Sequence, residues 1–95
     1  MDTPVHPVEA LRRIGFLLER AREPTYRVKA YRGAADVLAG LPAGELEQRL
    51  RDGTLTELKG IGAKTAAVAV QAAEGRVPEY LEKLEAGAAV PVTAG

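Results

Sequence analysis

The chain has 95 residues, which leaves room for one domain. It contains no cysteine and a single histidine, and this composition excludes a disulfide framework, a cysteine-based zinc site and a Cys/His catalytic dyad. Its 13 basic and 13 acidic residues give zero net charge, so the chain lacks the strongly basic balance that is typical of an autonomous nucleic-acid binder. The longest apolar run, residues 65–73, is far shorter than the ~20 residues of a membrane span, and no secretory leader is recognisable, so we expect a cytoplasmic protein without a membrane partner.

The charge is distributed unevenly along the chain. Between Arg12 and Arg32 there are seven basic residues and two acidic ones. Residues 36–57 have a net charge of −3, and residues 58–76 have a net charge of +2. A polyanionic partner would therefore meet two separate basic segments.

The first two predicted helices are marked by proline, glycine and apolar periodicity. Pro7 fits a first helical position, and this helix must end by Glu23 because the residue before Pro24 is pushed out of the α region. Its apolar stripe consists of Val8, Leu11, Ile14, Leu17, Leu18 and Ala21. Thr25 is expected to cap the next helix, which ends at Gly40 and Pro42. Its inward residues are Val28, Tyr31, Ala34, Ala35 and Leu38.

The second half of the chain reads as shorter helices. A helix over residues 45–51 with Leu46 and Leu50 inward is closed by Gly53. Thr54 and Glu57 predict a capping box for a one-turn helix over residues 55–58. A turn follows, then a helix over residues 63–74 that ends at Gly75 and a last helix over residues 78–85. The prediction is an all-α bundle of five to six short helices over residues 8–85, with an extension at residues 1–7 and a flexible tail or truncated linker at residues 86–95.

The turn over residues 59–62 is where the sequence becomes specific. Gly60 permits a positive φ, Ile61 anchors the turn in the core, and Gly62 allows a close approach of a ligand to the backbone. We expect free N–H groups on Gly62, Ala63 and Lys64 to point outward at the positive end of a helix dipole, where they can bind a phosphate. Lys64 adds a cation, and a site of this kind reads no base sequence.

This segment resembles the helix-hairpin-helix motif. The matching residues are Leu55, Leu58, Gly60, Ile61, Gly62 and Ala66, whereas Lys59 stands where the family usually has proline. The alternative interpretation is a plain helix–helix turn in which the glycines serve only backbone geometry.

The resemblance extends over about residues 8–85. The chain resembles the N-terminal domain of X-family DNA polymerases and, more closely, the helical domain that precedes bacterial PHP phosphoesterase domains. The segments that carry this resemblance are the leading helix at residues 11–19, residues 26–35 and residues 75–82. The expected fold is therefore of the polymerase-beta N-terminal type. We expect the chain to act with a catalytic domain, in the same or another chain.

The resemblance also implies a site. In family members this domain binds the 5′-phosphate of gapped or nicked DNA, and the contacting residues correspond to Lys64, Tyr31 and Arg27. Lys29 and Arg32 extend this second contact, although Tyr31 is about as well suited to the core.

Two further properties of the family lead to different expectations. The lysine that forms a Schiff base in lyase members corresponds to Val68, which has no amine, so we expect no enzymatic activity. A monovalent cation, Na⁺ or K⁺, can be held by main-chain carbonyls, here those of Thr56, Leu58 and Ile61, and we expect no other cofactor.

The predicted function is a non-sequence-specific DNA-binding module for DNA repair or processing. Two alternatives remain. One is a protein-interaction scaffold without DNA binding, which the zero net charge favours. The other is a deoxyribose-phosphate lyase that uses a displaced lysine such as Lys29 or Lys64.

Overall fold

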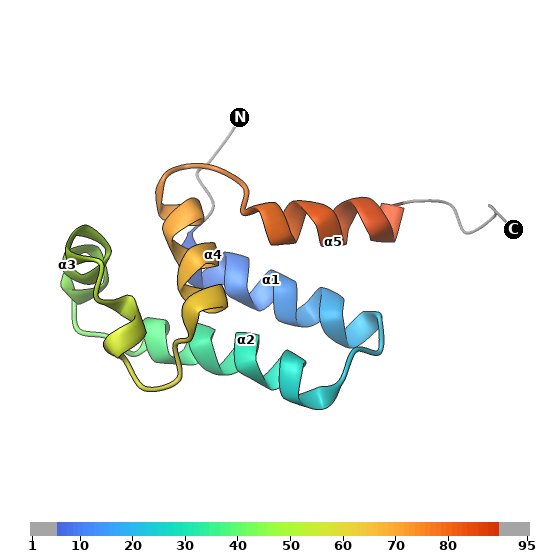
Figure 1. Cartoon of the computed structure of the whole chain (residues 1–95), viewed down its shortest axis with the longest axis horizontal. Coiled ribbons are helices and arrows are strands. Elements are labelled where there is room, and N and C mark those ends of the chain that lie inside the picture. The colour runs from blue at the N-terminus through green and yellow to red at the C-terminus, as the bar shows by residue number, and fades with distance from the viewer. Residues whose placement is uncertain (1–5, 90–95) are drawn as a thin grey trace, which may run out of the picture.

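A computed structural model describes residues 6–89, and within them the fold consists entirely of helices (Figure 1). The elements are α1 (Pro7–Arg20), α2 (Thr25–Ala39), α3 (Glu45–Asp52), the 3₁₀ turn η1 (Leu55–Glu57), α4 (Ala63–Ala73) and α5 (Glu79–Ala89). The predicted all-α fold is confirmed. Residues 1–5 and 90–95, which include most of the expected extension and tail, lie outside the described residues.

Helix α1 begins as the sequence predicts. Pro7 is its first residue, and the exposed His6 caps it by accepting a hydrogen bond from the Val8 amide at Nδ1, over 3.1 Å. The apolar stripe is buried except for Ala21, which was expected there but follows the last helical residue and is exposed. The chain leaves the helix at this point because Arg22 takes a positive φ of 60°.

Helix α2 runs back antiparallel to α1 and makes the largest helix–helix contact of the structure (Figure 1). The prediction that Thr25 caps it was wrong. Thr25 is the first helical residue, the capping position is Pro24, and no side chain donates or accepts a cap hydrogen bond there. The helix ends at Ala39, directly before Gly40, as expected.

The segment before the hairpin is held by an arginine in place of the predicted capping box. The Thr54 hydroxyl makes no cap hydrogen bond, so the Thr54/Glu57 box was wrong. Instead Arg49, from α3, donates to the Thr54 carbonyl over 3.2 Å. Gly53 ends α3 with a φ of 70°, as its sequence position predicted.

Helix α4 crosses α1 and α2, and α5 runs beside α1 (Figure 1). Gly75 turns the chain between them with a φ of 83°. The side chain of Gln71 accepts a hydrogen bond from the Glu79 amide over 2.8 Å and so ties the start of α5 to α4. Helix α5 extends to Ala89, beyond the expected end at Glu85.

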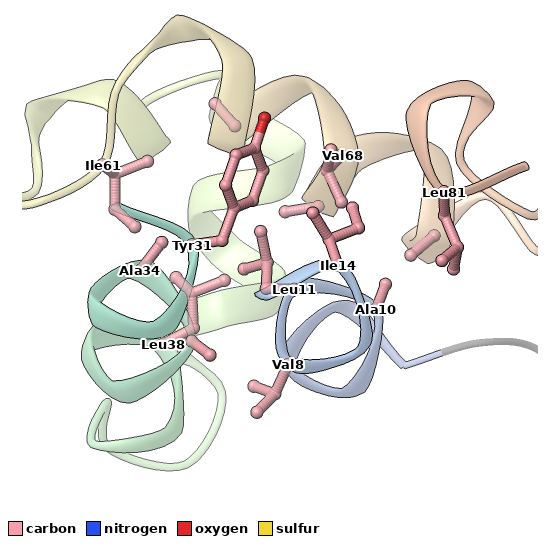
Figure 2. Close-up of a cluster of buried hydrophobic side chains, with 14 of the residues drawn as sticks. Val8, Ala10, Leu11, Ile14, Tyr31, Ala34, Leu38, Ile61, Val68 and Leu81 are labelled. Carbon is pink, nitrogen blue, oxygen red and sulfur yellow. The ribbon is translucent and has the colours of Figure 1, made fainter. Parts of the chain in front are cut away.

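The core lies where α4 and α5 meet the α1–α2 pair. Figure 2 shows side chains of this layer, including Ile14 of α1, Val68 of α4 and Leu81 of α5. Ile61 closes the layer from the hairpin and is 6% exposed. No helix within residues 6–89 is both long enough and apolar enough to cross a bilayer.

Candidate nucleic-acid interface

The hairpin turn is built by one backbone hydrogen bond and one glycine with a positive φ. The Ile61 amide donates to the Leu58 carbonyl over 3.1 Å. Gly60, between them, has a φ of 93°, a region that disfavours a Cβ. A Cβ on Gly60 would also stand 3.2 Å from the Val37 side chain of α2. The turn therefore needs glycine at this position, and Ile61 fixes it to the core.

The amides at the start of α4 are only partly free. The Thr65 hydroxyl accepts a hydrogen bond from the Gly62 amide over 2.9 Å and donates to the Gly62 carbonyl over 3.1 Å. The expectation of a free Gly62 amide was therefore wrong. Among the described residues, the amides of Ala63 and Lys64 have no hydrogen-bond partner. The Thr65 amide likewise has no partner but belongs to a buried residue, so the Ala63 and Lys64 amides are the free donors on exposed residues at the positive end of the helix dipole.

Sequence reasoning did not identify Thr65 as part of the site. A signal was present, because a threonine three residues after the capping position is in place to bond back to the backbone there. The Thr65 side chain is buried, whereas Ala63 and Lys64 are exposed. The hydroxyl thus fixes the backbone behind the two free amides.

Gly62 itself is not required by the fold. Its φ of −99° and ψ of −177° are extended backbone that any residue adopts, and a Cβ built on it would meet no atom within 4 Å. The space in front of this residue is open to solvent. It is the space through which an oxygen of a ligand would approach the Ala63 and Lys64 amides.

The two lysines of the hairpin carry uncompensated charge. Lys59 and Lys64 are both exposed, and neither forms an ion pair within the described part of the chain. Lys64 lies in the first turn of α4, where a cation is unfavourable for the helix dipole and favourable for a bound anion. Two cations therefore flank two free amides.

The predicted second contact is divided between two sides of α2. Arg27 and Tyr31 are four residues apart and share a side, whereas Lys29 lies two residues from each and points away. Arg32 is on the Lys29 side, where it pairs with Glu19 of α1. Only Arg27 and Tyr31 face the side of α2 on which the core lies.

Tyr31 is a core residue whose hydroxyl lies at the edge of the core. It is 5% exposed, and its ring lies 5.6 Å from that of Tyr80, centroid to centroid. Figure 2 shows the ring standing between Ile61 and Val68 with its oxygen at the outer end. Burial, with the neighbouring Tyr80, raises the pKa of Tyr31 above its usual value, and Arg27 opposes this rise. Arg27 also donates to Glu23 over 3.1 Å.

Val68 is part of the core and is 4% exposed. It lies on α4 one turn after Lys64, on the side that faces Ile14 (Figure 2). An amine at this position would have to be buried in the apolar layer.

The main-chain carbonyls of Thr56, Leu58 and Ile61, which the family resemblance suggests as cation ligands, each have at least one unused lone pair. The carbonyls of Thr56 and Ile61 accept no hydrogen bond from the described residues, and that of Leu58 accepts one, from the Ile61 amide. A carbonyl oxygen has two lone pairs, so Leu58 keeps one. Each of the three carbonyls therefore has a lone pair that no described residue occupies, as a cation held through main-chain oxygens would require. No group of three or more His, Cys, Asp or Glu side chains gathers within residues 6–89 to bind a transition metal.

A comparison with protein families decides the classification of this fold. The family model described as a helix-hairpin-helix domain matches residues 5–76. The chain belongs to the helix-hairpin-helix domain family. Domains of this family generally bind nucleic acid. Neither the curated proteins nor the solved structures gave a match.

Proposed function

We propose that this protein is a non-sequence-specific DNA-binding module that holds one backbone phosphate at the start of α4. The observation that carries the proposal is the pair of free amides on Ala63 and Lys64, flanked by two lysines without acidic partners. A phosphate oxygen accepts from backbone amides and a lysine ammonium at once, and such contacts carry no sequence information.

The open space at Gly62 supports the same site. Since neither backbone strain nor internal packing requires glycine there, its function is best explained by an external group that approaches the backbone. The family membership agrees, because domains of this family generally bind nucleic acid.

Of the residues considered for the second contact, we propose Arg27 together with the Tyr31 hydroxyl. They share one side of α2, and the Glu23 partner of Arg27 is partly exposed, so a phosphate can compete for the guanidinium. Lys29 and Arg32 lie on the other side of the helix and would meet a different strand or none.

The preferred DNA and the neighbouring domain follow from the resemblance to X-family polymerase and PHP-associated domains. We propose a gap or nick with a 5′-phosphate as the preferred site, because a terminal phosphate carries more charge and is less hindered than an internal one. In DNA repair or processing the module would hold this end for a catalytic domain.

The test is fluorescence anisotropy with three labelled duplexes: gapped with a 5′-phosphate, gapped with a 5′-hydroxyl, and intact. We expect the phosphorylated gap to bind most tightly, and we expect binding to weaken steeply with salt because a few phosphates are neutralised. Equal affinity for all three would reject the end preference. Salt-insensitive binding, or none at all, would reject the phosphate site and favour the scaffold alternative.

We further propose that the module binds DNA without lyase activity. A Schiff base needs an amine beside the sugar aldehyde, and Val68 supplies none. Borohydride trapping on an abasic oligonucleotide tests this directly. A trapped adduct that disappears in Lys29→Ala, or in Lys64→Ala when DNA is saturating so that weaker binding does not matter, would show a displaced catalytic lysine.

We also propose that Na⁺ or K⁺ binds the carbonyls of Thr56, Leu58 and Ile61 when DNA is present. Such an ion would neutralise the approaching phosphate. Affinity measured at constant ionic strength in sodium, potassium and tetramethylammonium salts should then be lower in tetramethylammonium. Equal affinity in all three would reject the ion.

A further inference from the structure

The outer side of α1 carries an exposed phenylalanine among arginines. Phe16 is 45% exposed and lies two residues from the buried Ile14 and Leu18, so it points away from the core. The guanidinium carbons of Arg13 and Arg20 stand 5.8 and 5.7 Å from its ring centroid. These contacts hold the ring in place without covering it.

A shallow groove of about 250 Å³ runs beside Phe16 along the seam between α1 and α2, lined by Arg12, Phe16, Arg32 and Asp36. An ion pair marks each end of the seam. Arg12 pairs with Asp36 over 3.8 Å, and Arg32 pairs with Glu19. The two helices approach closely between these pairs, because a Cβ on Gly15 would stand 3.1 Å from the Arg32 side chain. We call the surface formed by Arg12, Phe16, Glu19, Arg32 and Asp36 the Phe16 face.

The charges of the Phe16 face alternate in a pattern that is complementary to itself. Along α1 the positive Arg12 precedes Phe16 and the negative Glu19 follows it. On α2 the signs are reversed, since Asp36 lies beside Arg12 and Arg32 beside Glu19. A two-fold axis in the plane of this face, perpendicular to the helices, would therefore place Arg12 against Glu19 of a second copy.

The same axis places Asp36 against Arg32 of the second copy and the two Phe16 rings at the centre. On the other flank, Arg20 would face Arg13 of the second copy, which has the same charge. Glu85, which accepts from Arg13 over 3.2 Å, offsets part of this repulsion. Within residues 6–86, Arg20 has no acidic partner of its own. The four charged residues of the Phe16 face itself each find an opposite charge across the axis.

We propose that the Phe16 face binds the same face of a second copy of this chain, with the two α1 helices antiparallel. A two-fold interface uses one self-complementary surface twice, and aromatic and arginine side chains are the types enriched at the centres of interfaces. The two basic and two acidic residues of the Phe16 face give it no net charge to attract a phosphate backbone, which favours a second copy over nucleic acid as the occupant.

The association is weak, because the face presents a single exposed aromatic side chain. It needs no DNA and uses no residue of the hairpin. Its failure in an experiment would therefore leave the proposed phosphate site intact, and the failure of the phosphate site would not affect it.

Sedimentation velocity tests the proposal over protein concentrations from about 10 µM to about 1 mM, the range suited to a small interface. We expect the average mass to rise from 10.1 kDa toward twice this value. Phe16→Ala should weaken association by about tenfold, as loss of a central aromatic side chain does. Tyr26→Ala, on a residue that is 70% exposed and does not line the groove, is the matched control and should leave association unchanged.

A charge exchange gives the sharpest result. Arg12→Glu and Glu19→Arg should each remain monomeric, because each places like charges across the axis, whereas an equimolar mixture of the two should associate. Circular dichroism checks that both variants are folded. A monomeric wild type at the highest concentration, a monomeric mixture, or equal effects of Phe16→Ala and Tyr26→Ala would overturn the proposal. A loss of DNA affinity in Phe16→Ala would instead assign the face to nucleic acid.

Discussion

The two basic regions of this molecule differ in what stands beside their cations. Between residues 12 and 32, four of the seven basic residues have a carboxylate partner, namely Arg12, Arg13, Arg27 and Arg32, and the other three have none within the described residues. The hairpin has only two lysines, but neither is paired within the described residues, and two free amides lie between them in the chain. A larger fraction of the basic side chains is therefore neutralised by acidic partners in the segment that has more of them. For this reason, a count of charges along the sequence does not point to the proposed phosphate site.

The regions also differ in how they are attached to the core. Ile61 is 6% exposed, whereas Phe16 is 45% exposed. Ile61→Ala should lower the free energy of unfolding by about 2 to 4 kcal/mol, since it leaves a cavity under the turn. The same kind of truncation at Phe16 should cost under about 1 kcal/mol, because the ring is only half removed from water. Urea denaturation of both variants measures the contrast, and equal losses would show that the hairpin is not anchored by Ile61.

The two hairpin glycines should respond in opposite ways to alanine. Gly60→Ala should destabilise the fold by about 1 to 2 kcal/mol, because of the positive φ and the contact with Val37. Gly62→Ala should leave thermal stability unchanged, since its conformation is ordinary and its surroundings are open. It should weaken DNA binding by several-fold, because the new methyl group stands in the path of the phosphate. Unchanged DNA affinity in the folded Gly62→Ala protein would argue against a close approach at this residue.

Thr65→Val tests the role of the hydroxyl behind the free amides. The substitution keeps the shape of the buried side chain but removes both hydrogen bonds to Gly62. We expect a loss of about 1 kcal/mol of stability, which is typical for a lost cap. Thermal unfolding followed by circular dichroism gives the value. A fully stable Thr65→Val protein would mean that the turn is held by Ile61 alone.

The smallest expected effect is a pH dependence from Tyr31, whose pKa is raised mainly by burial. The unfolded chain releases this proton above about pH 10, while the folded state still holds it. Stability should therefore fall as the pH rises above the unfolded pKa, until the folded pKa is reached. Tyr31→Phe should remove this part of the loss in denaturation experiments between pH 9 and pH 11, values on either side of the ordinary tyrosine pKa of about 10. An identical pH profile in the variant would contradict the assignment.

Much of this fold could be predicted from local signals, because proline, glycine and apolar spacing act over a few residues. Pro7, Gly53 and Gly75 mark their boundaries as expected. The Thr25 cap failed because the helix starts one residue earlier, with the Pro24 carbonyl accepting from the Arg27 and Val28 amides. The Thr54/Glu57 box failed because Arg49 engages Thr54: its carbonyl accepts from the Thr54 amide and its side chain donates to the Thr54 carbonyl and hydroxyl. Local propensity cannot anticipate a partner from another helix.

Part of the candidate site's geometry was predictable. Gly60 has the expected positive φ, Ile61 is buried as expected and Lys64 is exposed, but the Gly62 amide is bonded to Thr65. The division of Arg27 and Tyr31 from Lys29 and Arg32 follows from helical spacing, which places residues two apart on opposite sides. The pairing of Arg32 with Glu19 depends on how α1 and α2 pack, and sequence spacing within one helix does not encode it.

The most direct test of the proposed phosphate site compares two substitutions that each replace a basic residue by glutamate, one in the hairpin and one on α2. Lys64→Glu and Arg32→Glu are both made on exposed residues and are assayed by anisotropy with the phosphorylated gapped duplex at several salt concentrations. We expect Lys64→Glu to lower affinity by at least about tenfold and to reduce the salt slope by about 1, the signature of one lost phosphate contact. Arg32→Glu should change affinity by less than about threefold. Equal losses from both variants, or a larger loss from Arg32→Glu, would contradict the proposed phosphate site and move the interface to the α1–α2 seam.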